Sequence, residues 1–306
     1  MTEVSLKTEV QRPGGLAVWL LAARPKTLPA ALVPVAVGTA FAMRIGEGQM
    51  IAALLCLGFA ILVQIGTNFA NDYFDFVKGA DTSDRIGPTR VTAAGLVEPR
   101  AMRVAIAVVF GLAFLLGLNL VNYGGWWLVL VGLACIILGL GYTAGPYPLA
   151  YNSLGDLFVF IFFGLVAVGF TFYVQAGFFT FEPLLAGAAV GALATNLLVV
   201  NNLRDRPTDG LAGKNTLVVR FGRRAALSQY AAGLSVAFLA PAILIMLPGY
   251  GASVLLPLIL APVGWRLHRL LRRAKSGAEY NVVLAKTGAF LLAYGAFFTA
   301  GLLARF

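Results

Sequence analysis

Residues 68–84 read Asn-Phe-Ala-Asn-Asp-Tyr-Phe-Asp-Phe-Val-Lys-Gly-Ala-Asp-Thr-Ser-Asp and end a long apolar stretch that begins near Met50. A second polar run, Asn-Asn-Leu-Arg-Asp-Arg-Pro-Thr-Asp at 201–209, ends another apolar stretch. Both runs contain Asn-x-x-x-Asp followed by a further aspartate: Asn68, Asp72 and Asp75 in the first, and Asn201, Asp205 and Asp209 in the second. Because residues three and four apart share one face of a helix, each run can direct oxygen ligands to one side of a helix end.

The composition is typical of a membrane protein. Of the 306 residues, 59% are hydrophobic and 12% are charged, whereas a soluble domain carries about 25% charged residues. We therefore predict an all-α, polytopic membrane protein with about nine transmembrane helices, each near the ~20 residues that a bilayer requires, in a single domain over residues 1–306. The expected spans are roughly 27–43, 50–71, 101–120, 124–142, 154–176, 181–201, 224–247, 252–270 and 281–303.

The distribution of basic residues predicts the orientation. Lysines and arginines on the side of the N-terminus and of both polar runs number 20, against two on the opposite side. We expect the protein in a cell membrane. By the positive-inside rule, the N-terminal segment 1–22 and the motif loops at 68–100 and 201–222 lie in the cytoplasm, and the C-terminus lies outside. The same rule accounts for the net charge of +10, so the charge does not indicate a nucleic-acid partner. The expected surroundings are membrane lipid, and the sequence identifies no protein partner.

The acidic residues are few and concentrated. Only 13 Asp and Glu occur in the chain, and six of them lie in the two polar segments: Asp72, Asp75, Asp81, Asp84, Asp205 and Asp209. Oxygen ligands from a few carboxylates suit Mg²⁺, which keeps several waters and completes its shell with substrate phosphates. The same loops carry cations that can bind the remaining phosphate oxygens, among them Arg90, Arg204 and Lys214. The sequence therefore predicts a magnesium–diphosphate site.

Such a site in a membrane favours one kind of chemistry. Metal and cations stabilise a departing diphosphate, so an allylic diphosphate can ionise and an electron-rich acceptor can capture the resulting cation. The span 154–176 is rich in aromatic residues, whose π faces attract carbocations. The only histidine, His268, lies among arginines at a helix end, and Cys56 and Cys135 fall inside apolar runs without metal spacing, so none of the three is expected to be catalytic.

The two polar runs also admit alternative interpretations. Helix capping explains one or two carboxylates at a helix start, but not two spaced sets at C-terminal ends, where the helix dipole disfavours negative charge. A cation-coupled transporter would carry acids at mid-membrane along a pathway, whereas these acids cluster on one side. A CDP-alcohol phosphotransferase would need the motif Asp-Gly-x-x-Ala-Arg…Gly-x-x-x-Asp-x-x-x-Asp, which the chain lacks.

The two motifs together resemble those of a known family. Asn-x-x-Asn-Asp-Tyr-x-Asp-x-x-x-Gly-x-Asp at 68–81 and Asn-Asn-x-Arg-Asp-x-x-x-Asp…Gly-Lys-Asn-Thr-Leu at 201–217 resemble the aspartate-rich motifs of the UbiA superfamily of intramembrane aromatic prenyltransferases. Four further stretches resemble the branch that prenylates 1,4-dihydroxy-2-naphthoate in menaquinone synthesis: Ala-Arg-Pro-Lys-Thr-Leu-Pro (23–29), Arg-Ile-Gly-Pro-Thr-Arg (85–90), Gly-Pro-Tyr-Pro-Leu-Ala-Tyr with Leu-Gly-Asp (145–156) and Lys-Asn-Thr-Leu-Val-Val-Arg-Phe-Gly (214–222). Beyond about residue 224 the resemblance is one of hydropathy and length.

This resemblance implies a bundle of nine helices around a central cavity, with Mg²⁺ as cofactor. It implies transfer of a polyprenyl group from polyprenyl diphosphate to 1,4-dihydroxy-2-naphthoate, with loss of CO2 and diphosphate, giving demethylmenaquinol. The implied ligands of metal and diphosphate are Asn68, Asp72, Asp75, Asn201, Asp205 and Asp209, of which Asp72, Asp205 and Asp209 are the catalytic candidates. The substrate-binding candidates are Lys26, Arg90, Arg204 and Lys214 for the diphosphate or the acceptor carboxylate, and Tyr142 for the cavity wall.

The choice of acceptor depends on one departure from the family pattern. Hydroxybenzoate-type relatives carry Tyr-x-x-x-Lys-Arg near 142–147, where this chain has Gly-Pro-Tyr-Pro. That difference favours naphthoate over a sister enzyme that uses hydroxybenzoate or homogentisate. The sequence leaves open the prenyl chain length, a phytyl donor, the proton acceptor and the order of decarboxylation.

Overall fold

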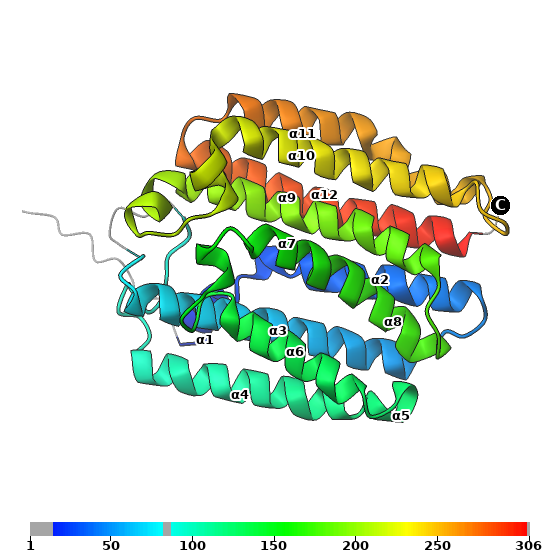
Figure 1. The fold of residues 1–306 in the computed structure, drawn as a ribbon, viewed down its shortest axis with the longest axis horizontal. Helices are drawn as coiled ribbons and strands as arrows, with labels where there is room; N and C mark the ends of the chain where they lie inside the picture. The colour runs from blue at the N-terminus through cyan, green and yellow to red at the C-terminus, as the bar shows by residue number, and fades with distance from the viewer. Residues whose placement is uncertain (1–14, 82–86, 305–306) are drawn as a thin grey trace, which may run out of the picture.

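The computed structural model describes residues 15–81 and 87–304, which form a bundle of long helices running side by side (Figure 1). No β-strand occurs in these two ranges, where the only bridge is an isolated one between Asn152 and Asn215. The all-α prediction is thereby confirmed for the described part of the chain. Residues 1–14 of the expected cytoplasmic segment, and Asp84 and Arg85 of the first motif loop, lie outside the described residues.

The helices follow one another with short connections. The α-helices are α1 (Gly15–Ala23), α2 (Pro29–Arg44), α3 (Met50–Val77), α4 (Pro99–Leu118), α5 (Val121–Gly124), α6 (Leu128–Gly141), α7 (Gly155–Phe160), α8 (Ala167–Ala176), α9 (Phe181–Leu211), α10 (Leu217–Leu244), α11 (Ala261–Arg273) and α12 (Gly277–Leu303). The other helical segments are the 3-10 turns η1 (Pro25–Thr27), η2 (Leu149–Tyr151) and η4 (Ala252–Leu260), and the π-helix η3 (Ile161–Val166).

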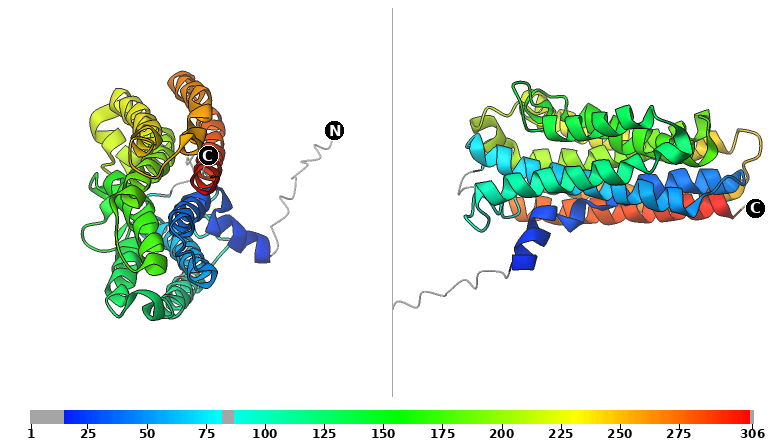
Figure 2. Two further views of the ribbon diagram at one scale, coloured as in Figure 1. Left: turned by 90° about the vertical axis from the view of Figure 1, so that its right-hand side faces the viewer. Right: turned by 90° about the horizontal axis from the view of Figure 1, so that it is seen from below.

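The number of membrane spans agrees with the prediction of about nine. Seven segments of the described chain are long and apolar enough to cross a membrane. The pair Gly15–Thr27 and α2 passes the same test as one span bent by 53°, and Figure 2 shows α1 projecting from the side of the bundle. The 14-residue α6 is apolar but shorter than a normal span.

Both motifs are more helical than the sequence indicated. The expected spans ended at 71 and 201, whereas α3 continues to Val77 and α9 to Leu211. The polar side chains there do not end the helices, because they bind one another and nearby cations across successive turns. The two helix ends lie at the same end of the bundle, opposite the C-terminus (Figure 1). The two motifs therefore meet in space, as a shared site requires.

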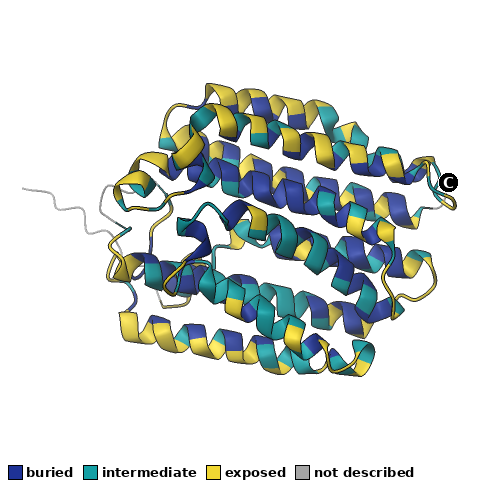
Figure 3. Ribbon diagram, viewed as in Figure 1, coloured by how far each residue is buried: buried dark blue, intermediate teal, exposed yellow. Residues whose placement is uncertain are grey.

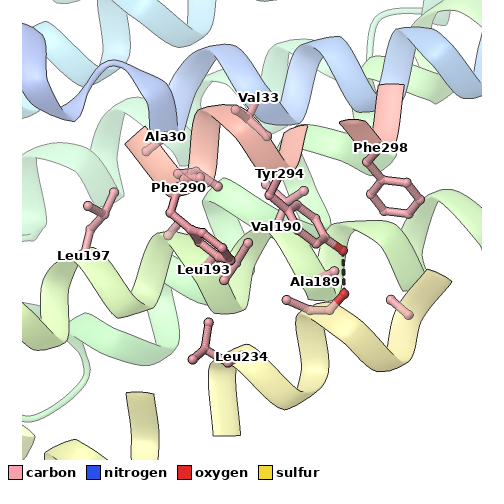
Figure 4. Packing of buried hydrophobic residues seen from close by; sticks show 14 of the residues in the cluster. Ala30, Val33, Ala189, Val190, Leu193, Leu197, Leu234, Phe290, Tyr294 and Phe298 are labelled. Atoms are coloured by element: carbon pink, nitrogen blue, oxygen red, sulfur yellow. Dashed lines mark hydrogen bonds between the residues drawn. The ribbon is translucent and has the colours of Figure 1, made fainter. Parts of the chain in front are cut away.

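The central helix is α9. In its most apolar window 72% of the residues are buried, against 17% for the segment formed by α4 and α5 at the edge (Figure 3). It packs against α10, α12 and η3. In the core around it, Val190 and Leu193 of α9 cluster with Phe290 and Tyr294 of α12, and the Tyr294 hydroxyl donates a hydrogen bond to the Ala237 carbonyl at 2.5 Å (Figure 4). The second motif is thus carried by a helix that is held on several sides.

Glycines set the distance between α9 and η3. Gly187 and Gly191, four residues apart on α9, face Gly164 of η3 backbone to backbone. Small residues at this spacing let membrane helices approach closely. A Cβ at Gly191 would lie 2.9 Å from Gly164 Cα and would also meet the Phe160 carbonyl oxygen. This contact fixes the segment that begins with α7 against the central helix.

Replacing Gly191 with alanine is expected to lower the midpoint of thermal unfolding of the purified protein in detergent. The added methyl group meets backbone atoms that cannot rotate away, and overpacking of this kind costs about 1–3 kcal/mol. Gly111→Ala in α4 is the matched control, since nothing lies within 4 Å of the position of its Cβ. Equal midpoints for the two variants would contradict this role of the glycine contact.

Candidate active site

A cavity of about 750 Å³ lies between the helices. Its wall reaches from Asp75 and Lys214 at the motif end of the bundle to Leu120 and Leu128 near the opposite end. Most of this wall is apolar, and its aromatic side chains include Phe59, Phe114, Phe158, Phe162, Phe163 and Phe170. The cavity can therefore hold an apolar chain along its length and a charged group at its motif end.

The first motif turns one helical face toward this cavity. Asn68, Asn71 and Asp75 line it, as expected for positions i, i+3 and i+7 of a helix. The amide nitrogen of Asn68 donates to the Ala23 carbonyl at 2.9 Å and to Thr27 Oγ1 at 3.2 Å. Its carbonyl oxygen is therefore the atom left for a ligand.

Asp72 lies elsewhere than the spacing predicted. It is not among the residues that line the cavity, and it is only 1% exposed. Its two carboxylate oxygens accept hydrogen bonds from the backbone amides of Val91 at 3.1 Å and Thr92 at 2.9 Å. In this structure Asp72 holds the segment after the first motif through these two hydrogen bonds.

The second motif is organised around a buried arginine. Arg204 Nη2 and Nε bind the carboxylate of Asp205 at 2.7 and 2.8 Å. The same guanidinium donates to Asn201 Oδ1 at 2.6 Å and to Asn281 Oδ1 of α12 at 2.9 Å. Asn201 and Arg204 line the cavity, whereas Asp205 does not. Arg204 therefore fixes the motif to α12 and presents positive charge to the cavity.

Lys214 joins the two motifs. Its Nζ lies 3.9 Å from Asp75 Oδ2 and 3.8 Å from Asp209 Oδ1. These two distances put the carboxylate oxygens no more than 7.7 Å apart. One carboxylate from each motif thus converges on a single positive charge at the edge of the cavity.

Asp75 has the most contacts of the first motif. Arg90 Nη2 lies 3.1 Å from its Oδ2, and the Tyr151 hydroxyl donates to its Oδ1 at 2.9 Å. Burial raises the pKa of the Tyr151 hydroxyl, and the neighbouring Asp75 carboxylate raises it further. Burial also lowers the pKa of Lys78, which donates to the Thr143 carbonyl and lies over the Tyr151 ring. This end of the cavity therefore brings together a buried carboxylate, a buried guanidinium and a tyrosine hydroxyl, with Lys78 at the exposed rim.

The remaining predicted residues lie on the same wall. Lys26, from η1, and Tyr142, at the end of α6, line the cavity. Burial raises the pKa of the Tyr142 hydroxyl, and the Asp156 carboxylate adds to the effect. The structure thus gathers Asn68, Asp75, Asn201, Lys26, Arg90, Tyr142, Arg204 and Lys214 around one cavity, with Asp209 at Lys214 and with Asp72 and Asp205 behind.

The sequence analysis did not propose several polar residues of the cavity wall, among them Asn71 and Arg24. Asn71 stands four residues before Asp75, which is the same spacing as Asn68 and Asp72. The sequence therefore contains two overlapping Asn-x-x-x-Asp pairs, and the spacing alone does not distinguish between them. Arg24 lines the cavity from a left-handed backbone conformation, with φ of 53°. The proline that follows Arg24 disfavours the right-handed helical conformation at this position. This Arg-Pro pair was the feature of the sequence that indicated a non-helical backbone here.

The donor set suits a hard divalent cation. Among residues 15–81 and 87–304, no three Asp, Glu, His or Cys side chains come close enough to form a metal site by themselves. The cavity wall instead offers the carboxylate of Asp75 and amide oxygens of asparagines, and the carboxylate of Asp209 lies close by, 3.8 Å from the Nζ of the cavity residue Lys214. Mg²⁺ is commonly held by one or two carboxylates, with waters and substrate phosphates completing its shell. The residues present therefore fit a magnesium ion that binds together with a diphosphate.

Known proteins share this sequence pattern. The UbiA prenyltransferase family matches residues 31–292. The chain is 39% identical over 288 residues to the 1,4-dihydroxy-2-naphthoate octaprenyltransferase of Mycobacterium tuberculosis, which covers 94% of this chain and 97% of that relative. It is 44% identical over 212 residues to the protein of the same name from Escherichia coli, with coverage of 67% and 68%.

Solved structures share the fold. A UbiA homolog from Archaeoglobus fulgidus bound to DMAPP and Mg²⁺ matches with a TM-score of 0.61 at 17% identity, over 94% of this chain and 99% of that one. The apo UbiA homolog from Aeropyrum pernix K1 matches with a TM-score of 0.66 at 16% identity, over 87% and 96%. The class of protein is an intramembrane prenyltransferase. The chain belongs to the UbiA prenyltransferase family.

Replacing Asp72 with alanine is expected to speed hydrogen exchange in peptides that contain Val91 and Thr92, because two buried amides lose their acceptors. Each unsatisfied group costs about 1–3 kcal/mol. The matched control is Asn71→Ala, at the neighbouring position on α3. It removes the hydrogen bond with Thr143 and leaves the amides of Val91 and Thr92 paired. Unchanged protection in the Asp72 variant, measured by mass spectrometry, would contradict this anchoring role.

Proposed function

We propose that this protein transfers a polyprenyl group from an allylic polyprenyl diphosphate to 1,4-dihydroxy-2-naphthoate, with release of CO2 and diphosphate. The observation that carries the proposal is the convergence of Asp75 and Asp209 on Lys214 at the polar end of an otherwise apolar cavity. This arrangement accounts for a charged head and a long apolar tail in one substrate. The named activity of the relatives at 39% and 44% identity supports the acceptor.

The motif residues divide into two groups in this proposal. Asp75 and Asp209, with the amide oxygens of Asn68 and Asn201, would hold Mg²⁺ at the motif end of the cavity. Behind them, Asp72 holds the segment at Val91 and Asp205 holds Arg204, so these two carboxylates keep the site in shape. When bound, the magnesium ion neutralises charge on the leaving diphosphate. The chemistry of the donor set and the Mg²⁺ complex of the Archaeoglobus fulgidus homolog support this assignment.

Cationic side chains bind the two substrates and aromatic rings stabilise the carbocation in this proposal. Lys214, Arg90 and Arg204 line the motif end of the cavity, and each can form charge-assisted hydrogen bonds to phosphate oxygens. Lys26 and Arg24, from the turn before α2, offer positive charge to the carboxylate of the acceptor. The stacked pair Phe158 and Phe162, with centroids 6.0 Å apart, lines the apolar wall. Their π faces stabilise an allylic cation while water is kept out.

The proposal is tested by prenyl transfer from radiolabelled geranylgeranyl diphosphate in detergent. We expect labelled product with dihydroxynaphthoate, and not with hydroxybenzoate or homogentisate, in the presence of Mg²⁺ and not of EDTA. Asp75→Ala and Asp209→Ala are expected to abolish transfer, because each removes a metal ligand. Glu182→Ala, at the far end of α9, is the control acid. Transfer to hydroxybenzoate would overturn the acceptor, and transfer in EDTA would overturn the metal.

We further propose that the motif end of the bundle faces the cytoplasm, as the basic loops there favour. The test uses Leu211→Cys and Met246→Cys, placed on side chains that are 91% and 82% exposed, in protein without Cys56 and Cys135. A membrane-impermeant maleimide is expected to label the cysteine at 211 only in inside-out vesicles and the one at 246 only in right-side-out vesicles. The reverse pattern would invert the topology.

A further inference from the structure

Asp156 is a buried carboxylate that the metal–diphosphate site does not use. It lies in the first turn of α7, lines the cavity and is only 4% exposed. Its Oδ1 accepts a hydrogen bond from Gln229 Nε2 of α10 at 3.0 Å. Within residues 15–81 and 87–304, no lysine or arginine forms an ion pair with it. A buried carboxylate without a cationic partner is costly even where a neutral amide and the start of a helix stabilise it.

The position of Asp156 along the cavity matches an acceptor beneath the diphosphate. Thr195 Oγ1 of α9 lies 3.4 Å from the Asp156 carbonyl oxygen. Thr195 precedes Asn201 by six residues, which corresponds to about 9 Å of helix rise. Asp156 therefore lies one aromatic ring system deeper than the second motif. The Tyr142 ring covers the same part of the wall, since a Cβ at Gly155 would lie 2.9 Å from its hydroxyl oxygen.

We propose that Asp156 is the proton acceptor for a ring hydroxyl of the aromatic substrate, an inference that rests on the proposed function. Oδ2 takes the hydroxyl proton as the adjacent ring carbon forms a bond to the allylic carbon. The allylic C–O bond breaks, and its electron pair leaves with the diphosphate. When the ring carboxylate departs as CO2, its bonding pair restores the aromatic ring and the ring oxygen recovers the proton from Asp156. The step needs no oxidant or further reactant.

Charge on the cavity wall orients the substrate for this transfer. The carboxylate of the acceptor is repelled by Asp156 and attracted by Arg24 and Lys26, which lie on the separate segment before α2. The hydroxyl beside that carboxylate is thereby directed to Asp156. Gln229, which holds one carboxylate oxygen, leaves the other for the substrate.

The test compares Asp156→Asn with Gln229→Ala in steady-state prenyl transfer to dihydroxynaphthoate by the full-length protein. The Asn variant keeps an oxygen that can accept from Gln229 but cannot take a proton, so its kcat is expected to fall by about 10²–10⁴-fold with an unchanged KM for geranylgeranyl diphosphate. Gln229→Ala keeps the carboxylate that takes the proton but removes the amide that positions it, so its kcat is expected to fall less than that of Asp156→Asn. Asp156→Glu is expected to recover part of the loss.

The opposite order of the two variants, with Asp156→Asn active and Gln229→Ala inactive, would show a structural role and overturn the inference. Folding is followed by the thermal midpoint and by Mg²⁺-dependent binding of geranylgeranyl diphosphate. Should Asp156→Asn unfold, the test depends on Asp156→Glu. A folded but inactive Asp156→Glu variant overturns the inference. If the wild-type protein transfers no prenyl group to dihydroxynaphthoate, the proposed function is refuted. If the wild type is active and Asp156→Asn is fully active too, only the role of Asp156 is refuted.

Discussion

Carboxylates from two helix ends meet at one end of an apolar bundle, and their mutual repulsion is the constraint on which the rest of the site depends. Each set stands in the last turns of its helix, where the helix dipole adds further negative potential. Positive charge is therefore needed to balance them, and it comes both from the connecting segments and from the second motif itself. Arg90 and Lys214 reach Asp75 from the two connecting segments, and Arg204 pairs with Asp205. Charge pairing thus ties both connections to the end of the cavity.

Helix packing makes this pairing possible. The central α9 is buried by α10, α12 and η3, and the glycine contact at Gly191 keeps η3 close. The second motif is therefore held by the core, while the first motif is positioned through the contacts of α3. Because α7 continues into η3, the same glycine contact also sets where Asp156 stands on the cavity wall. In the proposed function, the bundle therefore sets how far below the diphosphate the acceptor is bound.

The sequence predicted the helical class, the approximate number of spans and the two motifs, because apolar runs and clusters of acids are local features. Rotation about the helix axis is not local. Asn68/Asp72 and Asn71/Asp75 have the same spacing, and only the packing of α3 decides which side chains reach the cavity. The contact of Asp72 with the amides of Val91 and Thr92 joins segments about twenty residues apart, beyond the reach of periodicity. The sequence analysis also ended two spans too early, at the first polar residues of the motifs. These residues remain helical in the structure, where their side chains have polar partners.

Lys214 Nζ lies 3.9 Å from Asp75 Oδ2 and 3.8 Å from Asp209 Oδ1, the two carboxylates that would hold a divalent cation in the proposed function. A cation that enters must displace the ammonium group, and a diphosphate offers that group a new partner. In the proposed function, metal and diphosphate therefore bind with positive cooperativity, and by linkage each raises the affinity for the other by the same factor. In the proposed function, Lys214 thus pairs with the two carboxylates in the protein alone and with phosphate oxygens once the diphosphate is bound.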